Sequence, residues 1–121
     1  MVNMKKDLKM YILINDDIKI SKGKLAGQVG HAVASYFYNS HDDLTFHINI
    51  DEYMGGLQKK IILKCPQSKL EELEKEGFIS IRDAGLTQLE PNTLTCINLG
   101  ILDCNNRHKY FDFLDELKLV N

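Results

Sequence analysis

Four polar side chains of different chemistry recur at helical spacing within the stretch Lys22–Tyr38. They are Lys24, Gln28, His31 and Ser35. Their offsets of four, three and four residues place them on one stripe of a helix, opposite an apolar face. A solvated stripe usually carries Glu and Lys, so this set marks a candidate site. The alternative is an ordinary packed helix, in which Gly27 and Gly30 admit a neighbouring element close to the backbone.

The start of this helix is suited to an anion. Ser21 is a plausible N-cap, which places Lys22 and Lys24 in the first turn. Lysine opposes the helix dipole there, so its presence is explained if an anion such as a phosphate shares the site. Two solvated lysines are the competing interpretation.

A second candidate stretch, residues 82–92, follows a predicted strand. Asp83 can accept hydrogen bonds from a turn, Gly85 can adopt a positive φ, and Thr87 offers a hydroxyl. Asn92 follows a proline and also tolerates positive φ. Taken alone, this loop could simply be an Asx-turn.

The elements that must position these stretches alternate between strands and helices. Apolar, β-branched runs predict strands at 10–15, 59–65, 78–81 and 94–101. Helices are expected at 22–38, 68–76 with Gly77 as the C′ residue, and 105–117, with a helix or irregular cover at 42–54. This order predicts an α/β three-layer sandwich, a four-stranded mixed sheet with helices on both faces. Ligand sites in such sheets lie beyond the carboxyl ends of strands, where the loops 16–23 and 82–92 qualify.

Composition indicates one globular domain spanning residues 1–121, with 44% apolar and 26% charged residues. No apolar run approaches the roughly 20 residues that span a bilayer, and the polar, basic start is not a secretory signal, so no membrane association is expected. Three cysteines without ligand spacing indicate buried thiols at Cys65 and Cys96 and a cytoplasmic location. His41, His47 and His108 lack partners at ligand spacing, so we expect no metal and no cofactor.

Two motifs in this order carry a resemblance to a known family. Residues 23–32 read Gly-Lys-Leu-Ala-Gly-Gln-Val-Gly-His-Ala, and residues 83–88 read Asp-Ala-Gly-Leu-Thr-Gln. With Pro91 and Thr95, they resemble the second family of peptidyl-tRNA hydrolases, whose pattern is Gly-Lys-x-Ala-x-Gln-x-x-His-Ala followed by Asp-Ala-Gly-x-Thr-Gln. The similarity runs from about Lys9 to Leu119. It implies the sheet architecture described above, often as a homodimer, and cleavage of the ester between a peptide and the 3′ end of tRNA.

The resemblance also implies roles for individual residues. Asp83 would orient or deprotonate water, and Lys24 would stabilise the oxyanion or hold the terminal phosphate. Thr87 and Gln28 would position substrate or the Asp83 carboxylate. The residues expected to bind substrate are Lys22, Gln28, His31, Gly85, Gln88 and Thr95. A Ser-His-Asp triad using Ser35 is a disfavoured competitor, because side chains four apart on a straight helix seldom reach attack geometry.

Two further functions remain open at this stage. One is a non-catalytic relative that binds tRNA, another RNA or a protein through the same face, and the other is an assembly module that uses the glycine-bearing helix face. The net charge of −2 does not favour RNA binding, but six of the lysines lie in the first quarter of the chain and predict a one-sided basic surface.

Overall fold

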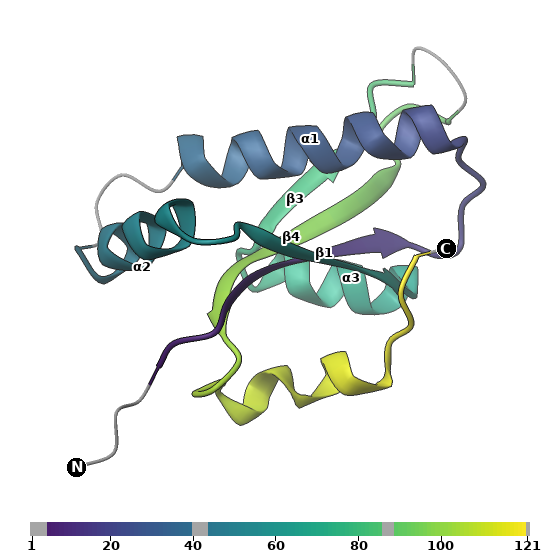
Figure 1. Ribbon diagram of the computed structural model, residues 1–121. Helices are drawn as coiled ribbons and strands as arrows, with labels where there is room; N and C mark the ends of the chain where they lie inside the picture. The colour runs from purple at the N-terminus through teal and green to yellow at the C-terminus, as the bar shows by residue number, and fades with distance from the viewer. Residues whose placement is uncertain (1–4, 40–43, 86–88, 121) are drawn as a thin grey trace.

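A computed structural model describes residues 5–39, 44–85 and 89–120 (Figure 1). Its elements, in chain order, are β1 (Leu8–Asn15), α1 (Lys22–Tyr38), α2 (Leu44–Gly55), β2 (Lys59–Cys65), α3 (Gln67–Lys75), β3 (Ile79–Arg82), β4 (Leu94–Asp103) and the 3₁₀-helix η1 (Lys109–Glu116). The predicted order of strands and helices is confirmed. The predicted bounds of α1 and β2 are also confirmed, since caps, Pro66 and periodicity are local signals.

The four strands form one mixed sheet in the order β2-β1-β4-β3. β1 and β2 are parallel, whereas β4 is antiparallel to both β1 and β3. β3 therefore runs in the same direction as β1, and both strands end at the same edge of the sheet. The loops that follow β1 and β3 are brought together there.

Helices cover both faces of the sheet, as predicted (Figure 1). On the face beneath α1 and α2, Met10 and Ile12 of β1 pack with Ala32 and Tyr53. On the opposite face, alternate β1 residues join a cluster with residues of α3 and η1: Tyr11, Leu13, Leu70, Leu73 and Leu114. The continuous apolar run of β1 follows from its burial on both faces.

The helix predicted over 105–117 is present, but it is shorter than predicted and of the 3₁₀ type. The structure has a turn held by the Asp103 carboxylate, which accepts from the N–H of Asn105, and then the short 3₁₀-helix η1. Phe111, Leu114 and Leu117 are spaced three apart, the period at which side chains align on a 3₁₀-helix. Leu114 is buried and the other two pack against its cluster, so the period of three rather than 3.6 buries this face.

Smaller differences concern the ends of other elements. β1 begins two residues before the prediction, β4 continues to Asp103, and β3 lies one residue later than expected. α3 begins at Gln67 because the carboxylate of Asp17 accepts a hydrogen bond from the Gln67 N–H at 2.9 Å. Gly77 follows the α3 cap with φ +98°, which confirms it as the C′ residue.

Candidate active site

An ion pair joins the first turn of α1 to the loop after β3. Ser21 caps the helix by accepting a hydrogen bond from the N–H of Lys24, which fixes the first turn. The Lys24 Nζ atom then lies 2.6 Å from Oδ1 of Asp83. Their side chains are only 18% and 5% exposed, so the pair is largely shielded from solvent. The two candidate stretches therefore meet at one point, as the sheet topology requires.

The Asp83 carboxylate is held from behind by its own loop. The Oδ2 atom of Asp83 accepts a hydrogen bond from the backbone N–H of Gly85 at 2.7 Å. The backbone carbonyl of Asp83 accepts one from the N–H of Asn92 at 2.6 Å. Gly85 has φ +77° and Asn92 has φ +68°, which confirms both expected positive φ values. A Cβ on Gly85 would lie 2.6–2.7 Å from atoms of Pro91, so only glycine fits this position.

The contacts of Asp83 stabilise its ionised form. The hydrogen bond from the Lys24 ammonium, followed by that from the Gly85 N–H, holds the pKa of the Asp83 carboxyl below its usual range. The group is therefore a carboxylate at neutral pH. It can accept a hydrogen bond from water, but its low pKa makes it a weak base.

A second link joins α1 to β4 one helical turn further along. Thr95 is buried, and its Oγ1 lies 2.7 Å from the side-chain amide of Gln28 and 3.0 Å from the carbonyl oxygen of Ile81. A hydroxyl carries one proton and cannot donate to two acceptors. The Thr95 hydroxyl therefore donates its one proton to one of two oxygens, Oε1 of Gln28 or the carbonyl oxygen of Ile81. Gln28 thus packs against the sheet rather than extending into solvent.

Other predicted site residues lie apart from this network. Lys22 is exposed on the opposite flank of α1 from Lys24. His31 is exposed, and the Asp83 carboxylate is engaged by Lys24 and Gly85, so no Ser-His-Asp triad is assembled among the described residues. Thr87 and Gln88 lie outside the described residues.

The glycine-bearing face of α1 is open. A Cβ added to Gly23, Gly27 or Gly30 would meet no atom within 4 Å among the described residues. The expectation that an element of this chain packs close to the backbone there is therefore wrong for the part of the chain that the structure describes.

Three polar residues that position the site were missed by sequence reasoning. Arg82 forms two contacts with Glu74 and donates from Nη1 to the carbonyl of Asn92 at 2.7 Å, which braces the loop. Asn15 donates to the carbonyl of Leu94 at 2.8 Å, directly before Thr95. Asn98 donates to the carbonyl of Ala32 at 3.0 Å and so holds α1 against β4. The signal in the sequence was asparagine within or ending a buried apolar run, since a buried amide must find partners.

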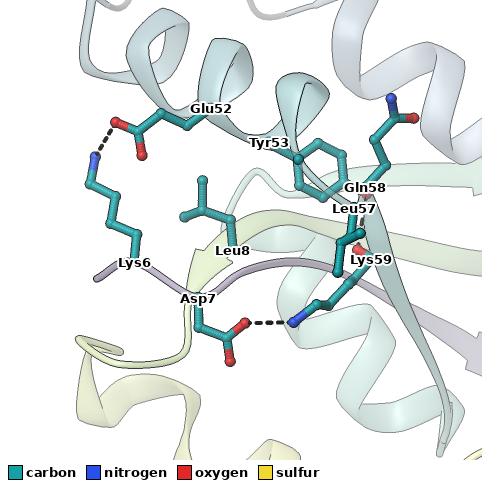
Figure 2. Close-up of a pocket in the computed structure, with 9 residues that line it drawn as sticks. Lys6, Asp7, Leu8, Glu52, Tyr53, Leu57, Gln58 and Lys59 are labelled. Atoms are coloured by element: carbon teal, nitrogen blue, oxygen red, sulfur yellow. Dashed lines mark hydrogen bonds and ion pairs between the residues drawn. The ribbon is translucent and has the colours of Figure 1, made fainter. Parts of the chain in front are cut away.

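A separate hollow of about 230 Å³ lies at the other end of the sheet, between α2 and the starts of β1 and β2 (Figure 2). Its charged side chains are already paired, Lys6 with Glu52 and Asp7 with Lys59. Tyr53 forms part of its wall and donates to the carbonyl of Lys59. Because these charges neutralise one another, this hollow lacks the poised groups of the Lys24–Asp83 site.

Among residues 5–39, 44–85 and 89–120, no group of three His, Cys, Asp or Glu residues is arranged to hold a metal ion. No helix in the same ranges is long and apolar enough to cross a membrane.

Comparison with known proteins identifies the family of this chain. The family model described as "Peptidyl-tRNA hydrolase PTH2" matches residues 8–117. A protein named peptidyl-tRNA hydrolase from Methanopyrus kandleri is 40% identical over 99 residues, which cover 76% of this chain and 83% of the relative. Those from Haloquadratum walsbyi and Saccharolobus solfataricus are 40% and 36% identical over 77% of this chain and 85% of each relative. The chain belongs to the PTH2 family of peptidyl-tRNA hydrolases.

Proposed function

We propose that this chain is an enzyme that hydrolyses the ester between a peptide, or an N-blocked amino acid, and the 3′ end of tRNA, releasing free tRNA. Its membership in the family and the names of its relatives support this reaction. The observation that carries the proposal is the shielded Lys24–Asp83 pair at the edge of the sheet, where the loops after β1 and β3 meet.

Asp83 orients the attacking water in this mechanism. Its carboxylate has a lowered pKa and two fixed hydrogen bonds. It therefore accepts a hydrogen bond from the attacking water and orients it, but does not remove its proton completely. Thr87, which belongs to the 82–92 stretch, keeps the role of a positioning hydroxyl that the family resemblance implies. Gln88 is its neighbour and is proposed to contact substrate.

Lys24 stabilises the negative charge that develops on the carbonyl oxygen. An ammonium group has three donors, and the Asp83 contact uses one of them. The remaining donors can reach an oxyanion or the terminal phosphate from a site where solvent screening is weak. Gln28, Thr95 and Gly85 support this arrangement by locking α1, β4 and the loop together. Lys22 and His31, which are exposed on α1, are proposed to contact the substrate.

A non-catalytic binding role is less well supported. Shielding an ion pair from water is costly, and an apolar pair of similar size would pack as well or better. A protein that used this face only for binding has no evident reason to keep the pair shielded, whereas the proposed mechanism uses both groups.

Release of peptide from a blocked aminoacyl-tRNA tests the proposal. We expect turnover by the wild type and a loss of at least about 100-fold in Asp83→Asn and in Lys24→Ala, since one acid–base or charge-stabilising group typically contributes about 10²–10⁴-fold. Lys75→Ala is the matched control, because Lys75 is an exposed lysine on α3, on the other face of the sheet. Wild-type turnover unchanged in folded Asp83→Asn would refute the site, and absence of wild-type turnover would refute the reaction.

Location and assembly are part of the same proposal. Cys65, Cys96 and Cys104 are free thiols, as suits the reducing cytoplasm in which tRNA is used. The family resemblance suggests a homodimer. Light scattering on the purified protein tests this, and a mass of one chain across the micromolar range would contradict it.

A further inference from the structure

An apolar groove runs along the flank of α1 that faces away from the Lys24–Asp83 pair. Its walls are Ile18 and Ile20 of the loop after β1, Leu25 and Val29 of α1, Ile62 of β2, and Val120 of the C-terminal segment. Two adjoining hollows of about 380 and 360 Å³ form it and share Lys22, Leu25 and Val120. Each volume lies within the range of pockets that bind small ligands. We call this feature the α1–β2 groove.

The outer wall of the groove is a strand-like segment laid on the edge of β2. Val120 donates to the carbonyl of Ile62 at 3.1 Å, and the N–H of Lys64 donates to the carbonyl of Lys118 at 2.8 Å. These bonds hold the apolar side chain of Val120 opposite α1. The groove is thus a built feature with a hydrogen-bonded wall.

The rim of the groove is predominantly cationic. Lys19, Lys22 and Lys64 line it, and Asp16 is the acidic residue among the described residues that line it. None of those lining residues is aromatic. Unpaired nucleotides are usually held by stacking on aromatic side chains, so an aliphatic groove is poorly suited to bases. Aliphatic walls with ammonium donors at the rim suit an extended peptide, which brings apolar side chains and backbone carbonyls.

The groove and the candidate active site lie on two sides of one helical turn. Lys22 lines the groove and Lys24 pairs with Asp83, and residues two apart on a helix point to nearly opposite flanks. Gly23 and Ala26 are exposed on this turn, and a Cβ on Gly23 would meet nothing within 4 Å. Among the described residues, the helix surface between the candidate site and the groove therefore carries only small side chains.

We propose that the α1–β2 groove binds the peptide portion of the substrate, with an apolar side chain about three residues from the ester. This inference rests on the proposed hydrolase function. A helix is about 10 Å across and an extended chain advances about 3.3 Å per residue, so roughly three residues cross the first turn of α1. The cationic rim favours peptides without basic side chains at that position.

Three substrates and two variants test this inference. The first substrate is an N-acetyl-aminoacyl-tRNA. The other two are N-acetyl-tripeptidyl-tRNAs with the same ester-linked residue, and they differ only in the third residue from the ester, which is leucine in one and lysine in the other. Ala26→Trp fills the groove, and Ala34→Trp is the matched control because Ala34 is exposed further along the same helix. For the wild type, we expect kcat/KM to be about tenfold higher for the leucine than for the lysine tripeptide, as burial of one leucine side chain allows.

The variants separate the groove from the reaction itself. In Ala26→Trp, we expect the leucine preference to disappear while kcat/KM for the single-residue substrate changes less than about twofold. Ala34→Trp should retain the preference. No wild-type preference, or an equal loss on all three substrates in Ala26→Trp, would overturn the groove assignment and leave the hydrolase function standing. A dimer that Ala26→Trp converts to monomer, without a substrate preference, would assign the groove to a second copy and also overturn it.

Discussion

Gly85 lies in close contact with Pro91 within the loop after β3, and its N–H donates a hydrogen bond to the Asp83 carboxylate. In Gly85→Ala, the new Cβ would lie 2.6–2.7 Å from backbone and side-chain atoms of Pro91, at a residue with φ +77°. A left-handed conformation costs a residue with a Cβ about 1–2 kcal/mol, and overpacking costs about 1–3 kcal/mol. We therefore expect Gly85→Ala to lower the free energy of unfolding by about 2–5 kcal/mol.

Urea unfolding, with linear extrapolation to water, measures this loss. Gly27→Ala is the matched control, because Gly27 lies in the exposed interior of α1 and its Cβ would meet nothing within 4 Å. There the same substitution should raise the free energy of unfolding by about 1 kcal/mol through helix propensity.

The substitution Gly85→Ala should also affect catalysis. Relief of the clash moves the Gly85 N–H away from Oδ2 of Asp83, so we expect kcat for peptide release to fall in Gly85→Ala and not in Gly27→Ala. A loss of stability below about 1 kcal/mol, or equal effects of the two substitutions, would refute the close approach of Gly85 to Pro91 on which this reasoning depends.

Further predictions concern Asp83, Thr95 and Asn98. The pKa of Asp83 is lowered from 3.8, so its ionised form adds stability that is present above pH 3.8 and is lost as the pH falls through the lower folded-state pKa. Unfolding free energies of wild type and Asp83→Asn, measured from pH 7 to pH 2, should converge at the acid end, and a constant difference would contradict the ion pair. Thr95→Val should lower the free energy of unfolding by about 1–3 kcal/mol, because it leaves the buried carbonyl of Ile81 without its donor. Thermal and urea unfolding check this, and an unchanged stability would argue against the hydrogen bond from Thr95 to Ile81. Asn98→Leu should cost about 1–3 kcal/mol and raise hydrogen exchange in α1 around Ala32, since it removes the amide that donates to that carbonyl. Unchanged exchange there would show that Asn98 does not hold the helix.

Local signals made much of the fold readable from the sequence. The bounds of α1 follow from the Ser21 cap and a 3.6-residue period, and Pro66 ends β2, so neither depends on distant contacts. Positive φ at Gly85 and Asn92 was predictable because few residue types adopt it. The motifs at 23–32 and 83–88 identified the family for the same reason, since each is a short contiguous pattern.

The site itself was decided by tertiary structure. Two loops far apart in the chain meet because β1 and β3 end at the same edge of the sheet, and only there does Lys24 meet Asp83. The same stripe of α1 was divided, with Gln28 packed on Thr95 and His31 left exposed, because helical period fixes neighbours on a face but not how far that face tilts toward the sheet.

Helix type and groove also depended on packing. The segment 105–117 has a pattern compatible with either helix type, and the contacts of Leu114 with the core selected the 3₁₀ form. The α1–β2 groove is assembled from a loop, a helix flank, a strand edge and the C-terminal segment. A single amino-acid sequence shows which residues can contribute to such a surface, whereas only the packed chain determines which of them share one.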